Sequence, residues 1–234
     1  MIIVVARDVF DTEENRDRAV IATQGPQGST RLEEPGCQMY CFAPDPVVPT
    51  EIQVYELWDT ASDLDAHFKH QNYTDMVDAL GNTGGMLHAI TRQYVADDRG
   101  TVYDEGTPRI DALDRNSLII VVARLVFETQ EHRDLAVIAG TEPQAKTREE
   151  EPGCLMYCFA PDPVVPTEIQ VYELWENAAS LDAHFKHPNY MGMVQALGSA
   201  GGVLDSINRQ YVVNDRGTVY DDDQKPRIEA LLAD

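Results

Sequence analysis

Residues 34–58 read EPGCQMYCFAPDPVVPTEIQVYELW, and the chain repeats this stretch at residues 151–175 with one change, from Gln38 to Leu155. Solenoid and propeller repeats have much shorter periods, of roughly 20–50 residues. A repeat this long therefore indicates a duplicated domain, and we expect the protein to have two equivalent sites.

The repeat extends beyond this stretch in both directions. The apolar run at residues 2–7 returns unchanged at residues 119–124. Each copy has about 115 residues, which is enough to bury an apolar core of its own. We therefore expect one domain at residues 1–115 and another at residues 118–234. The short connection between them predicts that the two copies pack against each other.

The chain of 234 residues carries a formal net charge of -22 at pH 7. A polyanion repels phosphate backbones and anionic lipid surfaces, so neither nucleic acid nor a membrane is expected as a partner. Simple solubility and the attraction of cationic ligands both remain open as reasons for this charge. No apolar run approaches the ~18 residues that cross a bilayer, and the opening run is too short for a signal peptide. We expect a cytoplasmic protein.

Each copy alternates strand and helix patterns in the order β-α-β-β-α-β, with an additional helical turn. This is the order of a ferredoxin-like domain, of the α+β class. Thr12 is expected to cap a first helix of about ten residues, which Gly25 and Pro26 would end or interrupt. The expected strands of the first copy are residues 2–9, 36–43, 50–58 and 86–95, and the other two helices are expected to begin at Thr60 and Asn72.

The tail of the first copy resembles a linker by composition. However, residues 98–104 return at residues 215–221, near the end of the chain, where no further domain follows in the sequence. The tail is therefore predicted to belong to the folded unit, as an arm that lies on the partner copy. The true linker shrinks to about residues 114–117.

Three motifs carry a resemblance to a known family. They are EPGC at residues 34–37, YELW at residues 55–58 and LDAHF at residues 64–68, with a Pro/Asp hairpin between the first two. In order and spacing they resemble the antibiotic biosynthesis monooxygenase (ABM) domain, of the dimeric α+β barrel superfamily. In that superfamily two ferredoxin-like units place their sheets face to face. The resemblance implies a covalently linked pseudo-dimer, and further homo-oligomerisation stays open.

The resemblance also implies an activity, the cofactor-independent oxygenation of quinols and polycyclic phenols. An electron-rich phenolate reduces dioxygen by itself, so the protein needs only to deprotonate, orient and desolvate the substrate. The expected partners are a small aromatic molecule and dioxygen. No cofactor and no metal is expected.

The third expected strand supplies two candidate site residues. Alternation puts Val54, Glu56 and Trp58 on one face, which in ABM domains looks into the cavity between the sheet and the helices. Glu56 is interpreted as a proton-transfer carboxylate with a raised pKa, or as a buried carboxylate bonded to the backbone or to Arg92. Trp58 is interpreted as an aromatic pocket wall or as a core residue. The same alternatives apply to Glu173 and Trp175.

His67 occupies the position where many ABM domains carry a histidine at the cavity edge. Three interpretations stay open: a structural residue, a catalytic base that accepts a phenolic proton, and a metal ligand with His70. No third metal ligand is evident, and His70 itself is expected at the surface. The same alternatives apply to His184.

The chain departs from the family at several positions. The quinol monooxygenases carry asparagine where this chain has Val54 and Val171, and an aromatic residue where it has Leu64 and Leu181. Haem-degrading members use an asparagine where Ala6 stands, so haem degradation is not expected. The apolar wall of the two sites is predicted to consist of Val54, Leu64 and Phe68 and of their counterparts Val171, Leu181 and Phe185.

The cysteines do not form a predicted metal site. Cys37 and Cys41 lie on an expected strand, where four residues span roughly 13 Å. Two thiols that far apart cannot share one zinc ion at about 2.3 Å each. Cys154 and Cys158 repeat the arrangement, and all four are interpreted as small buried residues in a reducing compartment.

The leading functional hypothesis is a cofactor-independent monooxygenase that acts on a small aromatic hydroquinone or phenol. The alternatives are a non-catalytic small-molecule binding module and an oxygen-independent isomerase or lyase on the same fold. Differences between the copies gather in the first helix and in residues 74–88. They indicate that the two cavities need not accept identical ligands.

Overall fold

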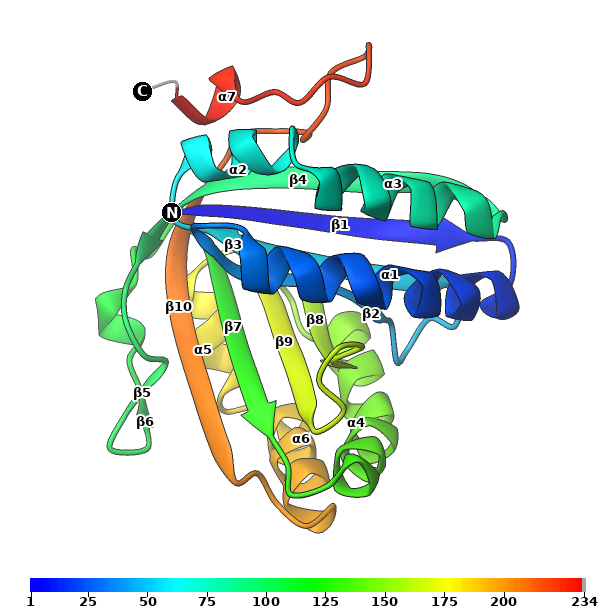
Figure 1. Cartoon of the computed structure of the whole chain (residues 1–234). Coiled ribbons are helices and arrows are strands. Elements are labelled where there is room, and N and C mark those ends of the chain that lie inside the picture. Colours follow the sequence, from blue (N-terminus) through cyan, green and yellow to red (C-terminus); the bar gives the residue numbers. More distant parts are fainter. Residues whose placement is uncertain (233–234) are drawn as a thin grey trace. The chain divides into compact units, whose positions relative to one another are not determined.

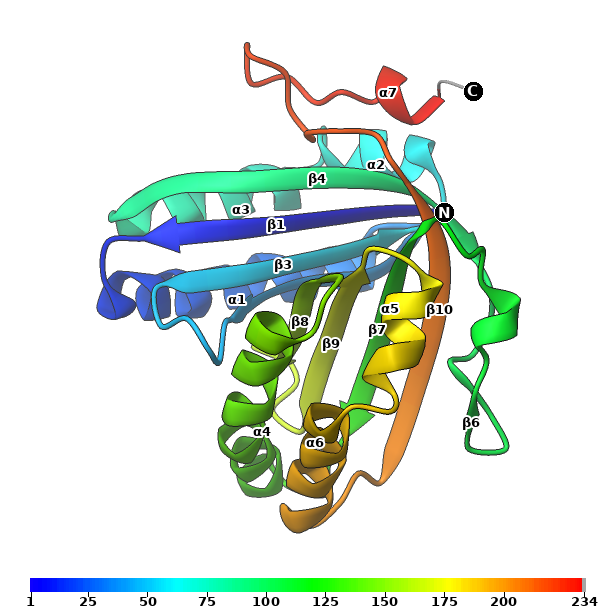
Figure 2. The ribbon, with the colours of Figure 1, turned by 180° about the vertical axis from the view of Figure 1, so that it is seen from behind.

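The computed structural model describes residues 1–232, which form two compact units (Figures 1 and 2). Unit 1 contains Met1–Ala96 together with residues 215–232, and unit 2 contains Asp97–Asn214. Each unit thus combines the body of one sequence copy with the tail of the other. This confirms the expectation that the tails are arms on the partner copy. The domain boundaries expected from the repeat stay a prediction.

Unit 1 has the expected element order. Its elements are β1 (Ile2–Phe10), α1 (Glu13–Glu33), β2 (Cys37–Pro44), β3 (Glu51–Trp58), α2 (Ala61–His67), α3 (Gln71–Thr83), β4 (Met86–Asp98) and α7 (Glu229–Leu232). The antiparallel sheet has the order β2-β3-β1-β4, and α1 and α3 lie together on one face (Figure 1). This is the ferredoxin-like arrangement.

Unit 2 repeats the same architecture. Its elements are β5 (Tyr103–Asp104), β6 (Thr107–Pro108), a 3-10 turn at Ile110–Ala112, β7 (Leu118–Val126), α4 (Gln130–Glu150), β8 (Cys154–Pro161), β9 (Glu168–Trp175), α5 (Ala178–His184), α6 (Pro188–Ser199) and β10 (Asp205–Asp215). Its sheet has the order β10-β7-β9-β8. The fold is therefore α+β, with two ferredoxin-like domains in tandem.

The first helix is twice as long as expected, because α1 continues through Gly25 and Pro26. Thr12 caps its start as predicted, with its hydroxyl accepting a hydrogen bond from the Asn15 N–H at 3.2 Å. A proline inside a helix costs about 3 kcal/mol, since it removes one hydrogen bond and crowds the preceding turn. Tertiary contacts offset that cost: the Gln27 Oε1, one residue beyond the proline, accepts from the backbone N–H of Phe42 on β2 at 2.8 Å.

The second copy reproduces this solution. Pro143 lies inside α4, and the Gln144 Oε1 accepts from the backbone N–H of Phe159 at 2.8 Å. The prediction of a shorter helix from the glycine and proline was wrong, because the sequence pattern does not show the hydrogen bond from the neighbouring strand.

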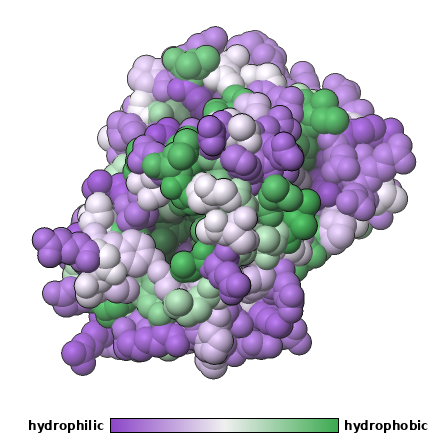
Figure 3. All heavy atoms as spheres, turned by 90° about the horizontal axis from the view of Figure 1, so that it is seen from below, coloured by the Kyte–Doolittle hydropathy of each residue, from purple (hydrophilic) through white to green (hydrophobic). Residues whose placement is uncertain are grey.

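The visible face is mostly polar, with apolar side chains at scattered places (Figure 3). Leu32 and Ile138 on the long helices and Leu87 on β4 are among the exposed apolar residues. Such isolated side chains are ordinary on a protein surface. None of the helices in residues 1–232 combines the length and apolar character that crossing a membrane requires.

Candidate functional site

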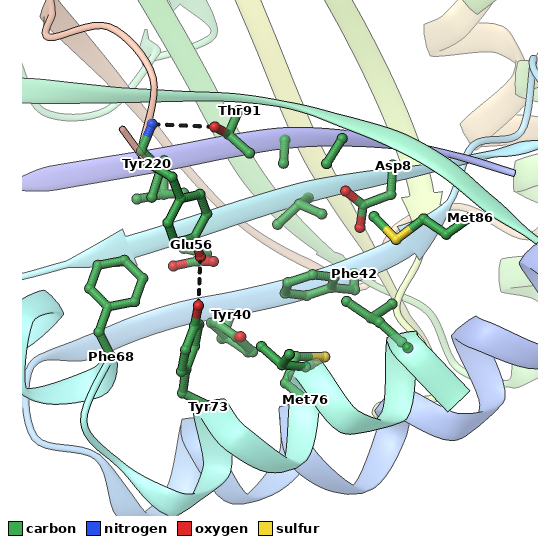
Figure 4. Close-up of a pocket in the computed structure, with 18 of the residues that line it drawn as sticks. Asp8, Tyr40, Phe42, Glu56, Phe68, Tyr73, Met76, Met86, Thr91 and Tyr220 are labelled. Carbon is green, nitrogen blue, oxygen red and sulfur yellow. Dashed lines mark hydrogen bonds between the residues drawn. The ribbon is translucent and has the colours of Figure 1, made fainter. Parts of the chain in front are cut away.

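A pocket of about 480 Å³ lies in unit 1 between the sheet, α3 and residues 215–232, which we call the C-terminal arm (Figure 4). Side chains that alternate along two neighbouring strands form the floor of the pocket. Val4, Ala6 and Asp8 on β1 point to the same face as Val54 and Glu56 on β3. The register of the two strands sets Val4 beside Glu56 and Ala6 beside Val54. The face predicted for the third strand is therefore the face that lines the pocket.

Glu56 is the carboxyl group at one end of this floor. It is 7% exposed, and its Oε2 accepts a hydrogen bond from the indole Nε1 of Trp58 at 2.9 Å. Burial raises the pKa of Glu56 to about 8, against the opposing effect of the Trp58 bond, and the nearby Glu34 and Asp8 add to the rise. A carboxyl group with a pKa near the working pH can both accept and return a proton.

The alternative that Arg92 neutralises Glu56 is wrong. The Arg92 guanidinium Nη1 instead lies 3.2 Å from the Asp215 Oδ2 at the start of the arm. Burial therefore keeps the pKa of Glu56 raised, because the indole N–H carries no charge and only partly opposes the effect of burial.

An aromatic pair closes the pocket beside Glu56. The hydroxyl groups of Tyr73 on α3 and Tyr220 on the arm lie 3.0 Å apart, and the Phe68 ring packs edge-on against both (Figure 4). The arm is fixed to the sheet by the backbone N–H of Val219, which donates to the Thr91 Oγ1 at 3.2 Å. The local sequence patterns did not predict this closure. The signal was available, because a tyrosine is kept in both tails.

His67 lies behind the pocket wall. Its Nδ1 is 2.7 Å from the Glu34 Oε2, and its ring centroid is 4.7 Å from that of Trp58 and 5.0 Å from that of Tyr40. It is 1% exposed and does not line the pocket. Burial lowers the pKa of His67, while Glu34 opposes that change. A neutral ring donates its Nδ1 proton to the Glu34 carboxylate, which accepts only.

Of the residues predicted for the site, the structure brings Val54, Glu56 and Phe68 to the pocket surface. Trp58 and Leu64 are fully buried in the core with His67. The unit 2 residues divide in the same way: Val171, Glu173 and Phe185 line its pocket, whereas Trp175, Leu181 and His184 are buried behind it. The roles of all these residues stay a prediction.

His70 has a local role. Its Nδ1 accepts from the backbone N–H of Asn72 at 3.2 Å and caps α3. Within residues 1–232, no three His, Cys, Asp or Glu side chains gather so that they could hold a metal ion. None of the four cysteines forms a disulfide bond, and Cys41 and Cys158 are buried.

The family model for antibiotic biosynthesis monooxygenase matches residues 1–79 and again residues 119–196. These two matches cover most of the chain. The chain belongs to the antibiotic biosynthesis monooxygenase family.

Solved structures with a similar fold include a candidate monooxygenase from Lactobacillus acidophilus, with 14% identity, a TM-score of 0.40, and coverage of 93% of this chain and 96% of that one. A candidate antibiotic biosynthesis monooxygenase from Caulobacter crescentus has 20% identity and a TM-score of 0.38, and the match covers 43% of this chain and 92% of that one. No curated protein matches the chain.

Unit 2 holds a smaller pocket of about 170 Å³. Glu173 repeats Glu56, with its Oε2 accepting from the Trp175 Nε1 at 2.9 Å and its pKa raised by burial to about 8. Tyr103 and Tyr190 close it, with their hydroxyl groups 2.9 Å apart. The two ABM pockets thus share a buried carboxyl group beside a pair of tyrosines.

The Glu34–His67 pair fixes the core behind the pocket, so its loss should destabilise unit 1. The Glu34→Ala substitution removes the acceptor for His67 Nδ1 and for Asn72 Nδ2, which donates to Glu34 Oε1 at 3.1 Å. Leaving buried donors unpaired costs about 1–3 kcal/mol, and we expect a loss of that size in the free energy of urea unfolding. Glu33→Ala, at the exposed neighbouring carboxylate, removes only a longer bond of 3.5 Å from Asn72 Nδ2 and should change it by less than about 0.5 kcal/mol. Equal losses in the two variants would contradict this account.

Proposed function

We propose that each ABM copy is a cofactor-independent monooxygenase that acts on a small aromatic hydroquinone or phenol. The observation that carries this proposal is the buried Glu56 carboxyl group, with its raised pKa, inside a pocket walled by apolar and aromatic side chains. Membership of the ABM family supports the same class of reaction.

In the proposed reaction the ionised Glu56 accepts the proton of a substrate hydroxyl group. The phenolate then gives electrons to dioxygen, a carbon–oxygen bond forms, and the second oxygen atom leaves as water. A hydroquinone thus yields a hydroxyquinone, with the substrate itself as the source of all electrons. Exclusion of bulk water strengthens the electrostatic interactions in the pocket and prevents side reactions of the intermediates with water.

We assign proton transfer to Glu56 rather than to His67, because Glu56 lines the pocket and His67 does not. His67 is assigned a positioning role. Its ring packs on Trp58, whose indole N–H holds the Glu56 carboxyl group.

Oxygen consumption tests this proposal directly. Dissolved oxygen is followed in metal-free buffer with a panel of naphthoquinols and anthrones, and ligand binding is followed in parallel by thermal shift. Protein-dependent uptake above autoxidation, with one oxygen atom found in the product, supports a monooxygenase. Thermal stabilisation without uptake for every compound would overturn it in favour of a binding module or an oxygen-independent enzyme.

The tyrosine pair over the pocket should affect substrate binding more than chemistry. Tyr73→Phe and Tyr220→Phe each remove the hydroxyl–hydroxyl bond that holds the arm in place. A net hydrogen bond contributes about 1 kcal/mol, so we expect KM in copy 1 to rise about fivefold with kcat little changed. The measurement uses a Glu173→Gln background, which silences copy 2. The double variant should resemble each single one, and additive effects would contradict a shared bond.

A further inference from the structure

β1 reads IIVVARDVF, and on the side of this strand that faces the pocket Asp8 follows the apolar residues Val4 and Ala6. It is 3% exposed and lines the unit 1 pocket near Met86 and Phe42, apart from Glu56 (Figure 4). Within residues 1–232, no side chain or backbone N–H donates a hydrogen bond to its carboxyl group, and no cation pairs with it. The pocket therefore contains a buried acidic group that the fold leaves unpaired.

An unpaired carboxylate in apolar surroundings is costly, and most proteins either pair such a group or lack it. Burial alone raises the pKa of Asp8 to about 7. A ligand that brings a positive charge and N–H donors to Asp8 would remove this cost on binding. The protein's net charge of -22 also draws cations toward it.

The second copy supplies an internal comparison, because Leu125 stands where the first copy has Asp8. The cross-strand neighbours differ too: Asp8 lies beside Ala89, whereas Leu125 lies beside Ser206. The rest of the floor is kept, with Glu173 in the place of Glu56. The change thus replaces a carboxyl group by an apolar side chain at one end of an otherwise similar pocket.

Strand geometry sets the size of a ligand that could reach both carboxyl groups. Glu56 is paired with Val4, and Asp8 lies four residues further along β1. At about 3.3 Å per residue this separation is roughly 13 Å along the sheet. A two-ring aromatic compound with a short aminoalkyl chain spans such a distance, with its phenolic hydroxyl at Glu56 and its amine at Asp8.

We propose that the unit 1 pocket selects an aromatic ligand that carries a basic amine, with the Asp8 carboxylate as its counter-ion, and that the unit 2 pocket selects an uncharged aromatic ligand. The proposal rests on the proposed function in one respect, that each pocket is a ligand site.

Calorimetric titration with two matched probes tests it. The first probe is 6-(2-aminoethyl)-2-naphthol, and the second is 6-(2-hydroxyethyl)-2-naphthol, which has the same shape without the charge. The titrations compare the wild-type chain with Asp8→Leu and Leu125→Asp. Each substitution installs the residue that the other copy already carries at this position, which favours correct folding.

The wild-type chain should bind the amine at one site at least about tenfold more tightly than the alcohol, since a hydrogen bond to a charged group contributes about 1.5–3 kcal/mol. Asp8→Leu should remove this preference and leave alcohol binding within about twofold. Leu125→Asp should create a second amine-selective site.

Amine binding that is unaffected by Asp8→Leu, or equal affinity of the wild-type chain for the two probes, would overturn the proposal. Alcohol binding that persists in every variant would at the same time leave the ligand site, and with it the proposed function, standing. Failure of the wild-type chain to bind either probe would overturn the premise of a ligand site together with the proposal.

Discussion

Replacement of both Glu56 and Glu173 by glutamine is expected to lower protein-dependent oxygen uptake by a factor of about 10²–10⁴, the usual contribution of a positioned general base. Glutamine keeps the size of the side chain, and its amide oxygen can still accept from the Trp58 or Trp175 indole N–H. The variant should therefore fold normally and bind aromatic ligands. Its loss should appear in kcat rather than in KM.

The same assignment predicts how activity changes with pH. A base must be ionised to accept a proton, and burial raises the pKa of Glu56 and of Glu173 to about 8. Wild-type kcat/KM should therefore rise as the pH increases through about 8 and then level off. Glu34 and Asp8 are the carboxyl groups whose charges act on Glu56, and the hydroxyl groups of Tyr220 and Tyr40 also interact with it. Burial raises the pKa of both tyrosines well above this range and that of Asp8 only to about 7, so we assign the rise through about 8 to Glu56.

Three comparisons complete the experiment. Glu56→Gln alone and Glu173→Gln alone should each leave the activity of the other copy. In the Glu173→Gln background, which leaves copy 1 as the active copy, His67→Gln should lower activity less than Glu56→Gln and should keep the rise near pH 8, because it disturbs only the support behind Trp58. If His67→Gln instead abolished that rise while Glu56→Gln preserved it, proton transfer would belong to the histidine.

Much of the fold could be predicted from the sequence. The repeat established two domains, the residue patterns gave the element order, and Thr12 and Thr60 cap their helices as expected. Most of these features are local, because a few neighbouring residues determine each of them. The length of α1 was missed because it depends on the bond between Gln27 and Phe42, fifteen residues apart.

The site was predicted in part, for the same reason. Strand alternation placed Val54 and Glu56 on the face that lines the pocket. The closure of the pocket joins Tyr73 to Tyr220, which are 147 residues apart in the chain, and no local pattern connects them. Asp8 was missed because an acidic residue near the end of a strand is ordinarily exposed, and only the assembled sheet shows that it is buried.

Replacement of Asp8 by leucine is expected to stabilise the protein, and more so at higher pH. Burial raises the pKa of Asp8 from 3.8 to about 7, so the folded state holds its proton more tightly than the unfolded state does. Stability must then fall as the pH rises from about 4 to about 7, and it levels off above that range. At full ionisation the shift corresponds to a penalty on the order of 4 kcal/mol, which leucine removes.

Urea unfolding at about pH 5.5 and about pH 8.5 measures this difference, at a safe distance from the isoelectric point near 4.4. The stability gained by Asp8→Leu should be about 2 kcal/mol larger at the higher pH, because Asp8 loses most of its remaining proton between these two values. Glu56 and Glu173 also titrate in this range, but they are present in both proteins, so their contributions largely cancel in the difference. Asp8→Asn should show the same pH dependence, since it too removes the ionisable group.

Leu125→Asp provides the reciprocal change. It places a carboxyl group in the equivalent apolar position of unit 2, so its destabilisation should grow with pH as that of Asp8 does. If the effect of Asp8→Leu did not vary with pH, the Asp8 carboxyl group would titrate alike in the folded and unfolded states. The unpaired Asp8 carboxylate destabilises the folded protein. A cation that binds and pairs with it recovers this free energy. The stability measurement therefore reports the cost of the unpaired Asp8 carboxylate, and the amine titration reports the free energy gained when a cation pairs with it.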